Sequence, residues 1–353
     1  MRVSAIGIVA CTFLALQAPA ASAAAAAAAE FKIVTASERG TYIQIGRDIA
    51  KFVAPEANIA LEVLPSAGSI ENVRRLRYEP GVKFAMVQSD VYQAFLDQAQ
   101  EGNVAAARML HPLRVIMPLY NEEIYFITRA DTPAEFIHEI KNAKINVGPV
   151  GSGTALSATT LYRLMFGKPI AEENASHLSN EDALVKLLTE KTLDVVVVVA
   201  GQPAKLLTDM KPEARQFIKL LKLDPNHSTA RAALRTYFPA TVRAANYPNV
   251  LTEDVPGIAV KAFLVTYNYD RPETIRYLTK FADSLCHNFP RLRTEGHPKW
   301  NEVELSLPAL GKGWSYFPPM ERHLRACPEP TAASQAVKQS QCTQQEKILG
   351  LCQ

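Results

Sequence analysis

Three strand-to-helix turns in succession constrain this chain more than any other feature. Apolar extended segments at 31–35, 59–64 and 84–87 each run into a turn of small polar residues, and each turn opens a helix. The helices carry apolar residues three or four positions apart, as one buried face requires. This order predicts parallel strands joined by crossover helices, and ligands bind such sheets beyond the carboxyl ends of the strands.

A second unit of the same kind follows a polar connector, so we expect two α/β lobes. A long apolar stretch at 257–268 predicts a strand that returns toward the first lobe. The first lobe would then comprise 30–125 and 260–325, the second 126–259, and the tail 326–353. The elements expected after the first unit are, in chain order, the connector 98–108, strands 113–119 and 124–128, helix 133–140, strand 145–148, helix 154–165, helix 180–190, strand 194–200 and, after the return strand, helix 271–289.

The N-terminus is typical of a secretory signal peptide. Arg2 precedes an apolar run at 5–16, and Pro19 is followed by the small residues 21–23. We predict a signal peptide over 1–23, cleaved near Ala23, an Ala-rich leader at 24–29 and a periplasmic location. The alternative, a membrane anchor, is disfavoured because the run is shorter than the ~20 residues that span a bilayer.

Composition excludes several classes of protein. The 353 residues are 48% hydrophobic and 21% charged, which is typical of a globular chain and not of a disordered, collagen-like or multi-span one. A formal net charge of +3 gives no basic footprint, so we expect no nucleic-acid partner.

Four cysteines remain beyond the predicted cleavage site: Cys286, Cys327, Cys342 and Cys352. In an exported chain they permit two disulfides, and the three possible pairings stay open. A metal site is the alternative. It is disfavoured because no Cys-x-x-Cys spacing occurs and no histidine follows His323.

The turn Gly151-Ser152-Gly153-Thr154 is the first candidate site. It lies between a strand and a helix start, where glycines admit a ligand, free amides point outward and the helix dipole favours an anion. The turn lacks the lysine of a P-loop and the third glycine of a dinucleotide fingerprint, so no nucleotide cofactor is predicted. The alternative is an ordinary capped helix.

Four polar turns together favour a binding cleft between lobes. They are 35–41, 66–69, 88–90 and 151–154, and all carry small hydroxyl or amide residues at strand ends. Asp90 would orient neighbouring side chains of the site, or its carboxylate would interact with the dipole of the helix that it begins. Tyr120 would line the cleft or be half-buried packing.

No catalytic set is found, so we expect a protein that is not an enzyme. Ser152 is not in a Gly-x-Ser-x-Gly motif, and the seven histidines are scattered without a pair at metal spacing. Glu122 and Glu123 are adjacent and would face opposite sides of an extended segment. We expect these groups to be solvated at the surface.

Four segments resemble the TAXI family, the extracytoplasmic solute receptors of TRAP transporters. They are Gly40-Thr41-Tyr42, Gly68-Ser69-Ile70-Glu71-Asn72, Val87-Gln88-Ser89-Asp90 and 147–154, within a resemblance over about 30–325. It implies a type II periplasmic-binding-protein fold, with mixed sheets in two lobes joined by a hinge. It also implies a small carboxylate ligand, such as glutamate, delivered to a permease driven by an ion gradient.

The sequence departs from the family at three places. Ala36-Ser37-Glu38-Arg39 replaces a Gly-rich first turn, Gln202 is more polar than the usual small residue, and the cysteine tail has no counterpart.

We predict that the solute carboxylate is held by Ser152, Gly153 and Thr154, with contacts from the other lobe and two tyrosines as walls. No cofactor and no metal is predicted, and we expect a monomer. The alternatives are a receptor that signals to a sensor partner and an exported enzyme acting on a small acid. The full set of predicted ligand-binding residues is Thr41, Tyr42, Ser66, Ser69, Gln88, Ser89, Tyr120, Gly151, Ser152, Gly153, Thr154, Gly201 and Gln202.

Overall fold

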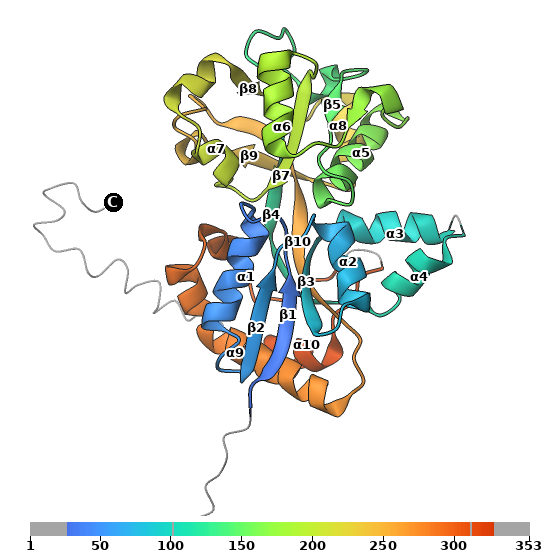
Figure 1. The fold of residues 1–353 in the computed structure, drawn as a ribbon, viewed down its shortest axis with the longest axis vertical. Helices are drawn as coiled ribbons and strands as arrows, with labels where there is room; N and C mark the ends of the chain where they lie inside the picture. The colour runs from blue at the N-terminus through green and yellow to red at the C-terminus, as the bar shows by residue number, and fades with distance from the viewer. Residues whose placement is uncertain (1–26, 101, 311–312, 328–353) are drawn as a thin grey trace, which may run out of the picture.

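The computed structural model describes residues 27–100, 102–310 and 313–327. The predicted signal peptide, residues 24–26 of the leader, Cys342 and Cys352 lie outside these residues. The elements form two lobes stacked along the long axis, and two long strands, β4 (Leu113–Arg129) and β10 (Val255–Tyr267), run from one lobe into the other (Figure 1).

Lobe 1 has the strand order β2-β1-β3-β10-β4. Its first three strands are parallel, and β10 runs antiparallel to β3 and β4. The remaining elements of this lobe are β1 (Ala29–Val34), α1 (Thr41–Phe52), β2 (Ile59–Leu64), α2 (Ser69–Tyr78), β3 (Val82–Gln88), α3 (Asp90–Gln100), α4 (Val104–Leu110), α9 (Pro272–Glu295), the 3₁₀ turn η6 (Pro298–Glu302) and α10 (Pro318–Arg325).

Lobe 2 continues the same sheet as β4-β7-β5-β6, with β8 paired to β4 and β9 to β10. Its helices cover both faces, as a buried sheet requires. Its elements are η1 (Ile137–Glu139), β5 (Ile145–Asn146), α5 (Gly153–Phe166), η2 (Glu172–Asn174), β6 (Ala175–Ser176), α6 (Asn180–Val185), the π turn η3 (Lys186–Glu190), β7 (Val195–Ala200), α7 (Lys205–Thr208), η4 (Pro212–Gln216), β8 (Ile218–Leu220), α8 (Ser228–Ala233), β9 (Phe238–Val242) and η5 (Ala244–Asn246).

This arrangement is the type II periplasmic-binding-protein fold that the sequence predicts. In lobe 1 the strand that returns from lobe 2, β10, lies between β3 and β4. The return strand was expected at 257–268 and lies at Val255–Tyr267.

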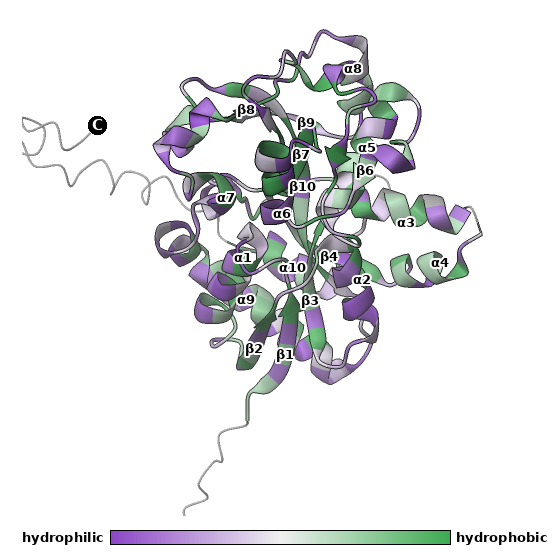
Figure 2. Cartoon of the chain, turned by 45° about the horizontal axis from the view of Figure 1, so that its top comes forward, coloured by the Kyte–Doolittle hydropathy of each residue, from purple (hydrophilic) through white to green (hydrophobic). Residues whose placement is uncertain are grey.

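Three apolar cores match this layout. One fills lobe 1 around Phe84 and Phe281, and the other two lie on opposite faces of the lobe 2 sheet. Adjacent residues of β4 alternate between these two faces: Phe126 belongs to one core and Tyr125 to the other. The central strands are hydrophobic and the outer helices mixed, as Figure 2 shows.

The two strands expected at 113–119 and 124–128 are one strand, β4. The polar residues 120–123 interrupt the apolar pattern, which led us to expect two segments. They remain extended because residues 121–124 pair with 258–261 of β10. The result is a continuous ribbon of two strands between the lobes.

Two further expectations were wrong. The connector 98–108 is largely helical, because α3 extends to Gln100 and Asn103 caps α4 by accepting from the Ala106 amide at 3.1 Å. The helix expected at 133–140 is reduced to η1, because the Ile137 amide donates to the Lys222 carbonyl and the Lys222 amide to Glu135. Tertiary pairing there replaces the local helical hydrogen bonds.

A disulfide joins Cys286 of α9 to Cys327, just beyond α10, with the two Cα atoms 5.6 Å apart. Of the three pairings that the sequence left open, the structure therefore shows the one that joins Cys286 to Cys327. It fixes the last described helix to the long helix under the lobe 1 sheet (Figure 1).

We expect the double variant Cys286→Ala with Cys327→Ala to be less stable by up to about 4 kcal/mol. The reason is that the bond closes a loop between residues 41 positions apart and so restricts the unfolded chain. Urea unfolding with and without reductant measures the effect. Equal midpoints for the oxidised and reduced wild-type protein would contradict it.

Candidate functional site

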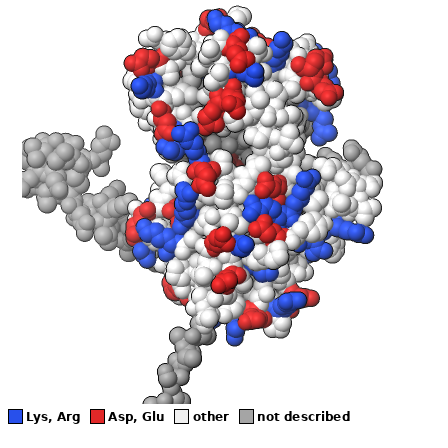
Figure 3. Space-filling view, in the orientation of Figure 1, with Lys and Arg blue, Asp and Glu red and all other residues white. Residues whose placement is uncertain are grey.

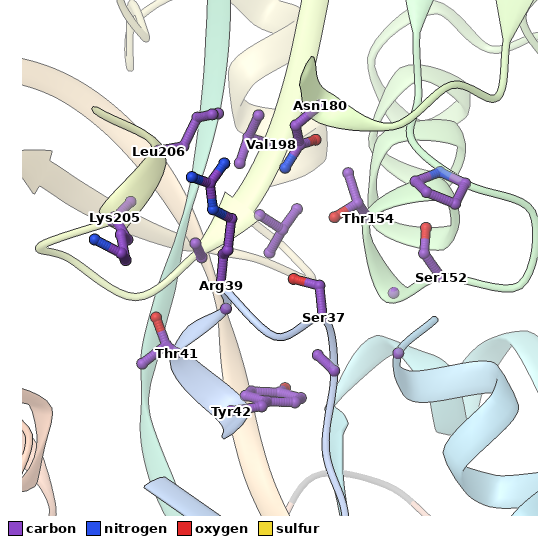
Figure 4. Close-up of a pocket in the computed structure, with 18 of the residues that line it drawn as sticks. Ser37, Arg39, Thr41, Tyr42, Ser152, Thr154, Asn180, Val198, Lys205 and Leu206 are labelled. Atoms are coloured by element: carbon purple, nitrogen blue, oxygen red, sulfur yellow. The ribbon is translucent and has the colours of Figure 1, made fainter. Parts of the chain in front are cut away.

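A cavity of about 540 Å³ lies between the two lobes. Its opening is the hollow between the lobes in Figure 3, and Figure 4 shows labelled residues of both lobes facing the same space. Lobe 1 contributes residues 36–42, 67–69 and Gln88, and the ribbon between the lobes contributes Glu122. The lining residues from lobe 2 are Pro149, 152–154, 179–181, Leu184, 198–200, 204–206, Asp209 and Met210.

The N-termini of three long helices converge on this cavity. The first residues of α1, α2 and α5 all line it. Ser152 caps α5 by accepting from the Ala155 amide at 3.0 Å, while the amides of Gly153 and Thr154 donate to no described residue. Free amides and aligned helix dipoles produce a positive potential without a charged side chain, which suits an anion.

Gly153 allows the two lobes to come into close contact at α5. A Cβ on this residue would lie 2.7 Å from Cδ of Gln88 and 2.8 Å from Oγ of Ser69. Both of these side chains belong to lobe 1, and the Ser69 hydroxyl donates to the Gln88 amide oxygen at 3.2 Å. Any larger residue at this position requires Gln88 and Ser69 to move.

Other contacts also join the lobes around the cavity. The Thr41 hydroxyl donates to the Gly201 carbonyl at 3.3 Å, and Arg39 pairs with Glu181 at 3.0 Å. The structure is therefore closed over the cavity, with α1 of lobe 1 bound to the end of β7.

The charged side chains at the cavity rim neutralise one another. Arg39 is paired with Glu181, and Lys205 is paired with Asp209 at 2.8 Å. Glu38 accepts from Arg47 at 2.8 Å. The rim therefore contributes little net charge, and the helix N-termini dominate the local field.

Glu122 corrects one expectation, because it is buried and not solvated. It is only 4% exposed, and its Oε2 accepts a 2.6 Å hydrogen bond from the hydroxyl of Tyr42. The pKa of Glu122 is raised to about 8, chiefly by burial; the nearby Glu123 carboxyl contributes to the rise, and the hydrogen bond from Tyr42 opposes it. No local feature of the sequence signals this burial, since a charged pair in a strand is usually exposed.

Glu123 is also buried, and it faces the opposite side of the ribbon, as its spacing predicts. It accepts from the amide and the side chain of Gln202, both at 2.9 Å, and from Lys299 Nζ at 3.2 Å. Lys299 is itself buried and donates to Glu302 at 2.8 and 2.9 Å. Glu123, Gln202 and Glu302 line a second cavity, of about 580 Å³, behind the ribbon.

Asp90 holds the lobes together beside the cavity. Its Oδ2 accepts from the hydroxyls of Ser157 at 2.6 Å and Tyr237 at 2.9 Å, both in lobe 2. Burial raises the pKa of Asp90 to about 6, while these two hydrogen bonds lower it. Asp90 is also the first residue of α3, so its position fits both roles considered for it, orienting other groups and pairing with its own helix dipole.

Seven of the predicted site residues line the cavity: Thr41, Tyr42, Ser69, Gln88, Ser152, Gly153 and Thr154. Six lie elsewhere. Ser66 bonds to Thr35 and Asn72, and the amide of Ser89 donates to the Lys261 carbonyl.

The other four are near the cavity without lining it. Tyr120 is fully buried with an unpartnered hydroxyl, and Gly151 has a positive φ of 81° at the turn before α5. Gly201 packs against Lys299, and Gln202 lines the second cavity.

Sequence reasoning missed several lining residues. Ser37 lies in the first polar turn, which was recognised as a whole. Asn180 follows Ser179, the N-cap of α6, whose hydroxyl accepts from the Asp182 amide at 3.1 Å. A serine in this position is a sequence signal for a helix start that could have drawn attention to Asn180. Lys205 and Leu206 come from α7, a helix of one turn without a sequence signature.

The described residues hold no group of three histidine, cysteine or acidic side chains placed for a metal ion. His138 and His227 do stack, with ring centroids 3.9 Å apart, although they are far apart in sequence. No helix in the described ranges combines the length and apolar character needed to cross a bilayer.

Two lobes that share the long strands β4 and β10, with a cavity between them at the N-termini of helices, form a fold of the periplasmic-binding-protein type. The chain belongs to the NMT1-like family, whose sequence model matches residues 33–311.

Solved structures resemble the chain only distantly. The periplasmic binding protein BugD is 15% identical, with 77% of this chain and 85% of that chain covered and a TM-score of 0.47. A putative periplasmic sulfonate-binding protein from Methylobacillus flagellatus is 13% identical, with 87% and 88% covered and a TM-score of 0.43. A structure described as a periplasmic transporter is 12% identical, with 90% and 98% covered and a TM-score of 0.48.

Proposed function

We propose that the protein is an extracytoplasmic solute receptor that captures a small organic anion between its lobes. The observation that carries this proposal is the convergence of α1, α2 and α5 on one enclosed cavity. Free amides at the start of α5 and the hydroxyls of Ser37 and Thr154 supply donors for a carboxylate. The cavity volume suits a ligand of metabolite size.

Closure of the lobes would retain the solute. Direct contacts between lobes, such as Arg39 with Glu181 and Thr41 with Gly201, require the closed arrangement. A partner that binds only this arrangement would respond only to the loaded receptor. We propose that the partner is a TRAP-type permease, which the resemblance of the sequence to the TAXI family supports.

Calorimetry with a panel of small organic acids tests the ligand class. We expect at least one acid to bind, and Thr154→Val to weaken that acid about 5- to 10-fold, because one hydrogen bond to a charged group is lost. Thr159→Val is the matched control, since the Thr159 hydroxyl donates to carbonyls within α5. Binding of simple amines in place of acids would contradict the proposal.

The partner is tested with membrane vesicles that contain a TRAP permease. We expect uptake of the labelled acid to need both the receptor and a sodium gradient. Uptake that needs ATP instead would assign the receptor to a different class of transporter and leave the ligand proposal intact.

A further inference from the structure

One buried carboxylate oxygen in the cavity has no partner. Glu122 lines the cavity, is only 4% exposed and uses Oε2 to accept from Tyr42. Its other oxygen, Oε1, accepts a hydrogen bond from no described residue. Oε1 is not one of the fully buried polar atoms, so it keeps some exposed surface. Oε1 therefore faces the cavity.

The groups around Glu122 do not supply a free cation. On β4 its neighbours are Glu123 and Tyr120, α1 presents Tyr42, and α3 presents Asp90. Among the described residues, the cation that lowers its pKa is Lys299 of η6, whose ammonium group is already bound to Glu123 and Glu302 behind the ribbon.

The cations at the cavity rim are engaged as well. Arg39 pairs with Glu181, and Lys205 pairs with Asp209. Glu122 is thus a buried acid whose natural partner, a positive charge, is missing from the described part of the chain. A buried carboxylate is costly unless it is paired, so Glu122 becomes a stable carboxylate only when a ligand supplies the positive charge.

We propose that Glu122 accepts a positively charged nitrogen of the solute, so that the cleft selects acids that carry an ammonium group. This inference rests on the function proposed above. The helix N-termini of α2 and α5 would hold the solute carboxylate, and Glu122 with Tyr42 would hold its ammonium group. Such a site recognises a zwitterion through two groups of opposite charge.

Binding of an ammonium group at Glu122 should release a proton from its carboxyl group. In the empty cavity burial holds the pKa of Glu122 near 8, so the carboxyl is mostly protonated at pH 7. A bound ammonium group favours the carboxylate and lowers this pKa, so the proton leaves to solvent on binding. The complex then holds fewer protons than the free protein, and affinity rises with pH.

The expected rise is about tenfold between pH 6 and pH 7, and it levels off above pH 8. A neutral Glu122 that donates its proton to a solute oxygen predicts the reverse, because that complex would need the proton. The direction of the pH dependence therefore separates the two roles.

The test uses matched pairs of acids with and without the amine: L-glutamate with glutarate, L-aspartate with succinate, and L-alanine with propionate. We expect calorimetry to show that the amine-bearing member of at least one pair binds at least about 30-fold more tightly. Measurements in phosphate and in Tris at pH 7 should show release of close to one proton.

Glu122→Gln should abolish most of this preference and the proton release, while the deaminated acid keeps its affinity within about threefold. Glu123→Gln is the matched control, because the adjacent carboxyl faces the second cavity, and it should keep the preference. Intact folding of each variant is checked by circular dichroism.

Two outcomes would overturn the inference alone: deaminated acids that bind the wild-type protein as tightly as their amine-bearing partners, and a preference that Glu122→Gln leaves unchanged. If no acid of either set binds to the wild-type protein, both the inference and the proposed anion receptor fail.

Discussion

Gly153→Ala should hold the two lobes apart and weaken solute binding by roughly 5- to 150-fold. The added Cβ would meet Gln88 and Ser69 of the opposite lobe, both of which are buried. Overpacking of this kind costs about 1–3 kcal/mol, and here the cost falls on the closed arrangement alone. Small-angle scattering should give a larger radius of gyration, and calorimetry should give the weaker affinity.

Two further variants define the cause of this effect. Gln88→Ala in the Gly153→Ala background removes the nearest colliding group, so the compact radius should return in part. Gly257→Ala is the control, because its Cβ would have no neighbour nearer than 3.7 Å. A Gly153→Ala protein as compact as the wild-type protein would contradict the prediction.

Lys299→Met should lower the free energy of unfolding by about 3–5 kcal/mol, since it leaves the buried Glu123 without a counter-charge. The Lys299 side chain is 0% exposed and that of Glu123 is 5% exposed, so the pair is shielded from bulk water. The Glu302 side chain is 47% exposed and can be solvated when the lysine is gone. Urea unfolding at pH 7.5 measures the loss.

The double variant Lys299→Met with Glu123→Gln should recover much of the lost stability. Replacing both partners removes the unpaired charge, and the one amide oxygen of the new glutamine can keep one of the two hydrogen bonds from Gln202. A loss below about 1 kcal/mol for Lys299→Met alone would show that Glu123 takes up a proton or finds another partner.

The repeated units of the fold could be predicted because their signals are local. Apolar alternation marks 59–64, and helical spacing marks the face of α1, so the parallel order followed from connection rules. The short elements of lobe 2 could not be predicted in this way. β5 and β6 have two residues each, and their pairing is decided by contacts distant in sequence.

The residues of the candidate site could likewise be predicted only where their signal is local. Ser152, Gly153 and Thr154 stand in a turn with a recognisable cap, and Ser69 follows a glycine at the start of α2. Glu122 carries no local signal of burial. Its position depends on β10 pairing beside it and on Tyr42 lying 80 residues earlier in the chain.

The shared strand β10 also determines how the chain can fold. It pairs with β3 in lobe 1 and with β9 in lobe 2, and with β4 in both. A chain synthesised only as far as residue 254 lacks a central strand in each half, so neither sheet is finished. Both halves therefore gain their final stability when one late segment is added, and they should unfold in a single cooperative transition.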